Sequence, residues 1–315
     1  MKVVEAIKQS KNPILSFEVI PPKVGGNINN IFEVLDDLIE FSPRFINVTK
    51  HANEIEFMEK EGKIEKIIRN KRPGTVGISA AIKNRYKIEV VPHLLCVGYN
   101  KYQLEDILID LNYLEFENVF VIRGDKNRYT WKVEGEYEHA SDLVRQISEL
   151  NQGNYTCPLK KAFPTNFCIG VAGYPEKHVE SPNLRKDLEY LKLKVELGAE
   201  FIITQMFFDV EYYKNFVKRV REIGIDIPII AWIKPIESKK SLYTIPKNFF
   251  VNIPQKVIQD FDEARSEQDE YKLGIKYTIN LIKDLLEIKV PGVHIFTMGR
   301  GKAVKEILRE LKGVF

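Results

Sequence analysis

The 315-residue sequence is poor in the residues that build disulfide frameworks and metal sites. It has only three cysteines, Cys96, Cys157 and Cys168, and no C-x-x-C pair. We therefore predict reduced thiols in a reducing compartment. His93 lies three residues before Cys96, but on a strand this spacing sends the two side chains to opposite faces. No metal site is predicted, because no other ligand cluster is visible.

Long apolar runs are also missing. The first segment, MKVVEAIKQSKNPILSF, has no apolar core of signal-peptide length, and no other run approaches the roughly 20 residues of a membrane span. The 47 basic residues are mixed with 44 acidic ones, which indicates solvated helix faces rather than a phosphate-binding stripe. We expect a cytoplasmic protein that binds neither membranes nor nucleic acid.

Nucleotide-binding glycine motifs are absent as well. No G-x-G-x-x-G follows a strand and no G-x-x-x-x-G-K-[ST] loop occurs, which argues against a Rossmann or P-loop nucleotide site. No repeat, low-complexity tract or Gly/Ser linker divides the chain. We expect one domain spanning residues 1–315.

What the sequence does contain is an alternation of short β-rich runs and longer amphipathic stretches. The expected strands span residues 14–20, 45–49, 90–96, 118–124, 167–173, 201–207, 228–234 and 292–298. The expected helices span residues 29–41, 75–86, 102–116, 181–198, 211–224, 269–288 and 302–315. Eight strands alternating with helices predict an α/β protein, a (β/α)₈ TIM barrel. The segment 237–268 is expected to form a long loop over the barrel mouth.

Polar residues cluster where the predicted strands end, which is where such barrels carry their chemistry. Glu18 and Gln205 each interrupt an apolar run, where an unpaired polar group is costly, so we favour functional roles for both. Thr49 and His93, taken singly, are more typical of structural positions than of functional ones. Other polar residues at strand ends are Arg123, Asp125, Tyr174, Glu176, Lys234, Thr297 and Arg300.

Six of these segments, in order, resemble the methylenetetrahydrofolate reductase family over essentially the whole chain. They are SFEVIPPK, VPHLLC, VIRGD, GVAGYPEKH, ITQMFFD and GVHIFTMGR. The resemblance is to the short bacterial form, which has only the catalytic barrel. It implies FAD-dependent reduction of 5,10-methylenetetrahydrofolate to 5-methyltetrahydrofolate by NADH or NADPH in two successive half-reactions, feeding methionine synthesis. A homo-oligomer is also expected.

The resemblance implies a role for each matching residue. Glu18 corresponds to the general acid, and Asp125 to the carboxylate beside the flavin and the folate. Gln205, Ser241 and Arg300 correspond to folate-contacting positions, although a glutamine is common where Ser241 stands. The positions that hold FAD correspond to Thr49, Ala52, His93, Arg123, Gly124, Asp125, Ala140, Tyr174, His178, Asp187, Tyr190 and Lys194. The chain departs from the family at Trp232, which stands where a glycine is usual.

These roles fit the chemistry of the reaction. The methylene-folate ring must open to an iminium ion before it accepts a hydride, and opening requires a proton on the departing nitrogen. A carboxylic acid kept neutral by apolar neighbours such as Phe17 and Val19 can donate that proton. Three alternatives stay open: another flavin-dependent barrel resembling proline dehydrogenase, a metal-assisted aldolase or lyase, and a folate- or flavin-binding protein without catalytic activity.

Overall fold

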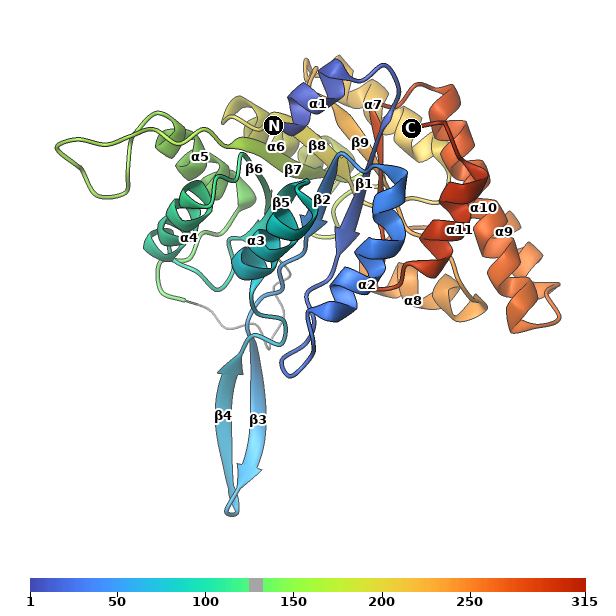
Figure 1. Cartoon of the computed structure of the whole chain (residues 1–315), viewed down its shortest axis with the longest axis horizontal. Coiled ribbons are helices and arrows are strands. Elements are labelled where there is room, and N and C mark those ends of the chain that lie inside the picture. Colours follow the sequence, from blue (N-terminus) through green and yellow to red (C-terminus); the bar gives the residue numbers. More distant parts are fainter. Residues whose placement is uncertain (125–132) are drawn as a thin grey trace.

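A computed structural model describes residues 1–124 and 133–315, and its central feature is a closed barrel of eight parallel strands (Figure 1). All eight predicted strands are confirmed. They are β1 (Ile14–Val19), β2 (Phe45–Val48), β5 (Glu89–Leu95), β6 (Asn118–Ile122), β7 (Cys168–Gly173), β8 (Phe201–Thr204), β9 (Ile229–Ile233) and β10 (Gly292–Phe296). The barrel closes between the first and last strands, where Glu18 pairs with Phe296. The predicted TIM barrel is therefore correct.

Helices surround the barrel. They are α1 (Val3–Gln9), α2 (Asn29–Leu38), α3 (Thr75–Tyr86), α4 (Lys101–Tyr113), α5 (Ala140–Asn151), α6 (Leu184–Glu196), α7 (Val210–Glu222), α8 (Lys239–Phe249), α9 (Gln255–Asp262), α10 (Glu267–Glu287) and α11 (Lys302–Glu310), with a short 3₁₀ turn η1 (Ile39–Phe41). The helix predicted over residues 75–86 is confirmed as α3. No helix in the described part of the chain is long and apolar enough to cross a bilayer.

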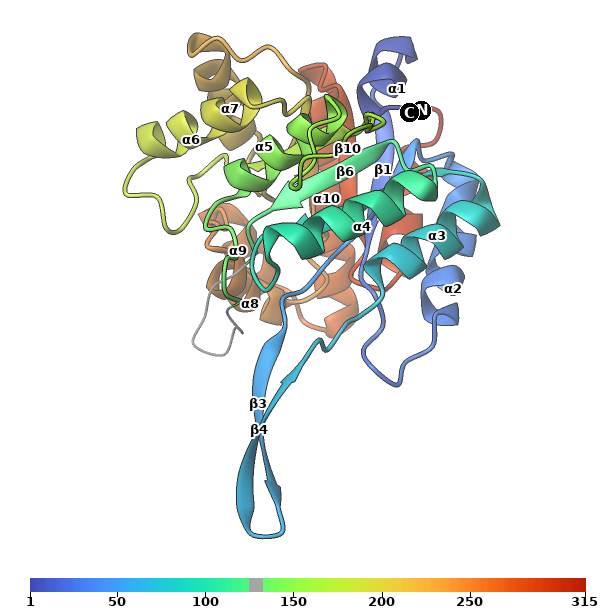
Figure 2. The same ribbon diagram turned by 90° about the vertical axis from the view of Figure 1, so that its left-hand side faces the viewer.

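Two expectations about connecting segments need correction. The loop expected over residues 237–268 contains α8 and α9, because Leu242, Ile245, Val257 and Phe261 form apolar faces that pack together in a buried cluster. Residues 54–69, for which no structure was predicted, form an antiparallel hairpin of β3 (Glu54–Lys60) and β4 (Lys63–Arg69). The hairpin extends well beyond the rest of the molecule in both views (Figures 1 and 2).

The alternation of side chains along the strands produces two cores. Residues facing outward, such as Leu15, Phe17 and Val19 of β1, pack against the helices. Residues facing inward fill the barrel with large rings, among them Phe45, Phe120 and Phe201. Gly170 makes room for these rings, since a Cβ there would lie 2.2 Å from Cζ of Phe201. The inward positions of β1 are Ile14, Ser16 and Glu18, so the carboxyl group of Glu18 points into the barrel.

Helix α1 covers the amino-terminal end of the barrel. The amide of Val3 donates a 2.8 Å hydrogen bond to Oδ1 of Asn118 at the start of β6. Nδ2 of Asn118 donates in turn to the Met1 carbonyl and to Glu89. In both figures α1 and the hairpin lie at opposite ends of the molecule. The carboxyl ends of the strands, where the candidate site lies, are therefore at the end of the barrel that α1 leaves open.

Candidate functional site

A buried carboxyl group forms the centre of the site. Glu18 is only 7% exposed, and its Oε2 lies 3.4 Å from Nε2 of His294 and 3.7 Å from Nε2 of His93. His93 comes from β5 and His294 from β10, so three strands supply this cluster. His294 was not predicted to belong to the site, although it occupies an inward-facing position on β10, as Glu18 does on β1.

Two further polar residues hold the histidines in place. Nδ2 of Asn47 lies 2.9 Å from Nε2 of His93, and Oγ of Ser16 lies 2.8 Å from Nδ1 of His294. Neither Asn47 nor Ser16 was singled out from the sequence. Ser16 lies two residues before Glu18, so its shared face could have been recognised from spacing alone.

The protonation states follow from burial. Burial raises the pKa of Glu18 from its ordinary 4.5 to about 7, and attraction to His93 opposes this only in part. Burial lowers the pKa of His93 to about 4 and that of His294 to about 3. Near pH 7 both imidazoles are neutral and a large fraction of Glu18 carries a proton. The cluster can therefore hold a proton and donate it.

Two buried oxygens beside this cluster have no hydrogen-bond partner within residues 1–124 and 133–315. They are Oδ1 of Asn47 and Oγ1 of Thr49, at the carboxyl end of β2. A buried polar atom without a partner is rare in a native protein and often marks a ligand contact. Thr49 is one of the positions predicted from the resemblance, and Asn47 is not.

A second group of predicted residues meets at the ends of β6 and β7. Arg123 forms a bidentate ion pair with Glu180, with 2.6 Å between Nη2 and Oε1. The amide of Glu180 donates to Nδ1 of His178 at 3.2 Å, and the rings of Tyr174 and His178 lie 4.7 Å apart. Burial lowers the pKa of His178. Arg123, Tyr174 and His178 thus lie together, and their contact with FAD stays a prediction.

Helix α6 contributes two more predicted residues to this group. Oδ2 of Asp187 accepts the amide of His178 at 3.1 Å, and Oδ1 accepts the Ser181 hydroxyl at 2.8 Å. Nζ of Lys194 donates to the Ala172 carbonyl of β7 at 2.8 Å, and burial lowers its pKa to about 8. These residues lie two turns apart on one face of α6. They give this end of the barrel one acidic and one basic group.

The remaining positions predicted to hold FAD lie around this group. Ala140 begins α5, and its neighbour His139 stacks on the half-exposed ring of Tyr190, with 6.4 Å between the ring centres. Gly124 follows β6 with φ +89°, a conformation that favours glycine. Ala52 lies between β2 and the hairpin. Asp125 falls outside the described residues, so its predicted position is not addressed.

The predicted folate positions occupy the other side of the barrel mouth. Gln205 follows β8, and its Oε1 accepts the Met206 amide at 3.0 Å. Ser241, in the first turn of α8, lies 3.2 Å from Ser238 through the two hydroxyls. Arg300 is largely exposed after β10, with Nη1 3.8 Å from Oε2 of Glu237. Hydrogen bonds from Thr297 to the Glu18 carbonyl connect this loop to β1.

Trp232 on β9 fills space between these elements. Its ring lies 5.3 Å from Phe296 and 6.4 Å from Phe249, measured between ring centres. Its Nε1 is buried and has no acceptor within the described part of the chain. Lys234, two residues later, is buried too, and burial lowers the pKa of its ammonium group.

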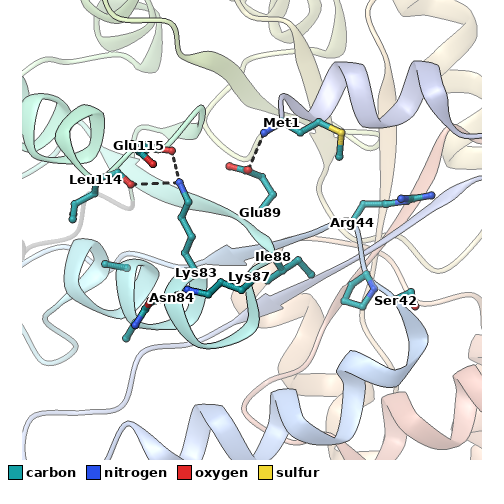
Figure 3. A pocket seen from close by; sticks show the side chains of 13 residues that line it. Met1, Ser42, Arg44, Lys83, Asn84, Lys87, Ile88, Glu89, Leu114 and Glu115 are labelled. Carbon is teal, nitrogen blue, oxygen red and sulfur yellow. Dashed lines mark hydrogen bonds and ion pairs between the residues drawn. The ribbon is translucent and has the colours of Figure 1, made fainter.

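A hollow of about 1030 Å³ elsewhere on the surface contains none of the predicted site residues (Figure 3). It lies between α3 and the amino-terminal end of the barrel, and several of its charged groups already have partners. Lys83 donates to the Leu114 and Glu115 carbonyls, and Glu89 pairs with the terminal amine of Met1. No group of three or more potential metal ligands occurs in residues 1–124 and 133–315.

Comparisons with known proteins identify the family. The sequence profile described as "Methylenetetrahydrofolate reductase" matches residues 2–312. The chain belongs to the methylenetetrahydrofolate reductase family. It is 31% identical over 289 residues to the 5,10-methylenetetrahydrofolate reductase of Escherichia coli, covering 91% of this chain and 87% of that protein.

Longer relatives match only in part. The chain is 30% identical to a "Probable methylenetetrahydrofolate reductase (NADPH)" of Caenorhabditis elegans, covering 98% of this chain and 43% of that protein. It thus spans about half the length of the eukaryotic relatives it matches. A solved structure from Clostridium thermocellum, described as binding two copies of 5-methyl-5,6,7,8-tetrahydrofolic acid, superposes with a TM-score of 0.61 at 16% identity and covers 99% of both chains. That likeness supports the fold.

Proposed function

We propose that residues 1–315 act as one FAD-binding catalytic barrel that reduces 5,10-methylenetetrahydrofolate to 5-methyltetrahydrofolate with electrons from NADH or NADPH. The product would feed methionine synthesis. The observation that carries the proposal is the buried Glu18, whose pKa of about 7 makes it a proton donor at neutral pH. A buried acid of this kind is what opening of the methylene-folate ring requires.

The cluster around Glu18 supports its role as the acid. His93 and His294 remain neutral near pH 7, so neither imidazole carries a positive charge that would ionise the carboxyl group. Both rings still lie close enough to fix the orientation of the carboxyl oxygens. Glu18 would therefore hold its proton until the folate binds and would then donate it to the departing nitrogen of the ring. The bond between that nitrogen and the methylene carbon breaks as the proton arrives, and the iminium ion forms at the other nitrogen.

The residues present fit an FAD molecule. Oγ1 of Thr49 and Oδ1 of Asn47 are buried and have no partner in the described part of the chain, so a ligand could satisfy them. Arg123, His178 and Lys194 offer cationic or donor groups to a diphosphate, and Gly124 leaves the backbone after β6 uncovered by a side chain. A bound flavin would supply hydride exchange between a reduced nicotinamide and the folate. The residues of the chain would bind it, orient it and exclude water.

The folate would bind between Glu18 and the group formed by Gln205, Ser241 and Arg300. The guanidinium of Arg300 is exposed and suits the carboxylates of a folate tail. Gln205 offers an amide group to the pterin ring. Asp125, which lies beyond the described residues, is proposed to act beside the flavin and the folate, as the family resemblance implies.

The decisive experiment measures the two half-reactions separately. Purified protein is loaded with FAD, and separate samples are reduced by NADH or by NADPH without oxygen. Each reduced sample is then mixed with methylenetetrahydrofolate. We expect a yellow protein whose flavin absorbance is lost on reduction by one or both nicotinamides and returns when the folate reoxidises it. A protein that neither carries nor binds FAD would overturn the proposal. Bleaching without reoxidation would instead indicate a flavoprotein acting on another acceptor.

A further inference from the structure

The hairpin of residues 54–69, called here the arm, has no role in the proposed reaction. Its strands β3 and β4 pair with each other and with no other strand of the described chain. An isolated two-stranded hairpin is at best marginally stable in water. Each strand also leaves an outer edge of backbone groups unpaired, which is a ready template for pairing with another chain. The arm therefore has the features of an interaction element.

One face of the arm is apolar. Side chains on a strand alternate between faces, so the pairs Ile55–Ile68, Phe57–Lys66 and Glu59–Ile64 share one face. On that face Phe57 is 62% exposed, Ile64 77% and Ile68 41%. Large apolar side chains gathered at this exposure mark a surface that another protein covers. The other face carries Met58 and Ile67 among charged residues.

The base of the arm is firmly attached to the barrel. Nζ of Lys71 lies 2.6 Å from Oε2 of Glu54 and 3.5 Å from Oε1 of Glu56. Nη1 of Arg72 donates to the Pro21 carbonyl at 2.5 Å, and the Val24 amide donates to the Lys71 carbonyl at 2.9 Å. Both bonds reach the loop that follows β1 and Glu18. The arm is thus joined to the barrel beside its open end.

The charge of the arm argues against a partner whose surface is strongly positive or strongly negative. The arm contains five glutamates and four lysines or arginines, distributed along both strands. Nucleic acid and anionic membranes select basic surfaces, and a strongly basic protein would select an acidic one. A nearly neutral surface of mixed charges suits a partner with the same mixture. Another arm has that mixture.

Strand edges and contact area favour the same partner. The barrel is closed, so within the described residues the arm carries the only open strand edges of the chain. The seven residues of each strand reach about 23 Å, so one face is much smaller than the roughly 800 Å² that each partner buries in a stable interface. In a dimer with a two-fold axis each contact occurs twice, so the interface contains both arms together with the surface beside each of them.

We propose that the arm is a self-association element, and that its apolar face and open edges pair with the arm of a second copy of this chain. The proposal is independent of the reaction proposed above. It predicts a dimer whose two copies join through arms rooted beside their active sites.

The test compares substitutions on the two faces of the same strand. Phe57→Glu places a carboxylate on the apolar face opposite Lys66, and Met58→Lys places an ammonium on the other face opposite Glu65. Both create pairs of opposite charge across the hairpin, so both should preserve the hairpin itself. Ile64→Lys, opposite Glu59, likewise places a charge on the apolar face, this time on β4.

Sedimentation velocity of the full-length chain over a range of micromolar concentrations gives the result. We expect a wild-type dimer, an unchanged dimer for Met58→Lys, and a dissociation constant raised at least about 30-fold for Phe57→Glu and for Ile64→Lys. Amide exchange in residues 54–69 should slow as the wild-type concentration rises. A monomeric wild-type chain, or equal dissociation constants for Phe57→Glu and Met58→Lys, would overturn the proposal whatever the enzymatic activity.

Discussion

Glu18 and His294 come from the first and last strands of the barrel, and their side chains meet inside it with 3.4 Å between Oε2 and Nε2. Both are buried, and burial keeps His294 neutral at pH 7 and leaves a large fraction of Glu18 protonated. The pair places a proton at a defined point at the end of the barrel opposite α1. Several expectations about the reaction depend on that proton.

The first prediction separates the two half-reactions. Glu18→Gln keeps the size of the side chain and removes the proton donor. We expect the folate half-reaction to slow by about 10² to 10⁴-fold, the usual contribution of a general acid, and reduction by nicotinamide to change little. Stopped-flow absorbance of each half-reaction gives the two rates. Equal losses in both would show that Glu18 is not the acid.

The second prediction concerns pH and stability. The folded state holds the Glu18 proton more tightly than the unfolded chain, since its pKa is about 7 rather than 4.5. This contribution to the free energy of unfolding is fully present below pH 4.5 and is lost as the pH rises through 7. The lowered pKa of His294 acts oppositely, and because burial alone causes it, the wild type and Glu18→Gln share it.

Glu18→Gln removes the carboxyl contribution. The difference in free energy of unfolding, variant minus wild type, should therefore be about 3 kcal/mol more positive above pH 7 than at pH 4.5. Urea titrations of both proteins at several pH values measure this difference. If the difference stays constant from pH 4.5 to above pH 7, the carboxyl group is not buried as described.

The third prediction tests the group on α6. Lys194→Met keeps an unbranched side chain of nearly the same length and removes its ammonium. If Lys194 faces a bound diphosphate, the affinity for FAD should fall by about 10 to 100-fold, the usual range for a hydrogen bond to a charged group. Equilibrium dialysis measures FAD binding without requiring activity. Lys192→Met, an exposed position on the same helix, is the control and should bind FAD as the wild type does.

The fourth prediction concerns Trp232. Because its Nε1 has no acceptor among the described residues, Trp232→Phe loses no hydrogen bond within the protein and keeps a ring against Phe249 and Phe296. We expect the free energy of unfolding without ligand to change by less than about 1 kcal/mol. The KM for the folate should rise if the indole binds it, whereas reduction by nicotinamide should be unaffected. An unchanged KM would exclude the indole nitrogen from folate binding.

The fifth prediction tests the packing inside the barrel. Gly170→Ala would place a Cβ 2.2 Å from Cζ of Phe201 and 2.8 Å from Cδ2 of Phe120. Such overpacking should lower the free energy of unfolding by about 3 kcal/mol or more. Gly77→Ala in α3 is the matched control, since nothing lies within 4 Å of its added Cβ. It should be neutral or stabilise by up to about 1 kcal/mol. Thermal unfolding compares the two.

The barrel could be predicted from the sequence because each strand has an apolar run bounded by turn residues, and because eight such runs alternate with helices. The arm could not, since its two strands alternate charged and apolar residues as an exposed helix also can. Helices α8 and α9 were hidden by Pro246 inside one and Pro254 before the other. Both helices pack through only a few apolar residues, so their periodicity is short.

The candidate site was predictable only in part. Glu18 was recognisable because a carboxylate interrupts an apolar strand. His294 was not, because a histidine between Val293 and Ile295 reads as part of a buried strand until its partner is known. The pairing of β1 with β10 supplies that partner, and no local pattern in either strand contains this information.

Closure of the barrel between β1 and β10 also sets an order in time. Glu18 leaves the ribosome well before its partners, since His294 and Thr297 follow it by 276 and 279 positions. Until β10 is added, one side of β1 remains an open edge and the buried acid does not yet exist. Chains interrupted anywhere before the last strand would leave the ribosome without a site and with a strand edge prone to aggregation. Assembly of the acid therefore waits for the synthesis of β10.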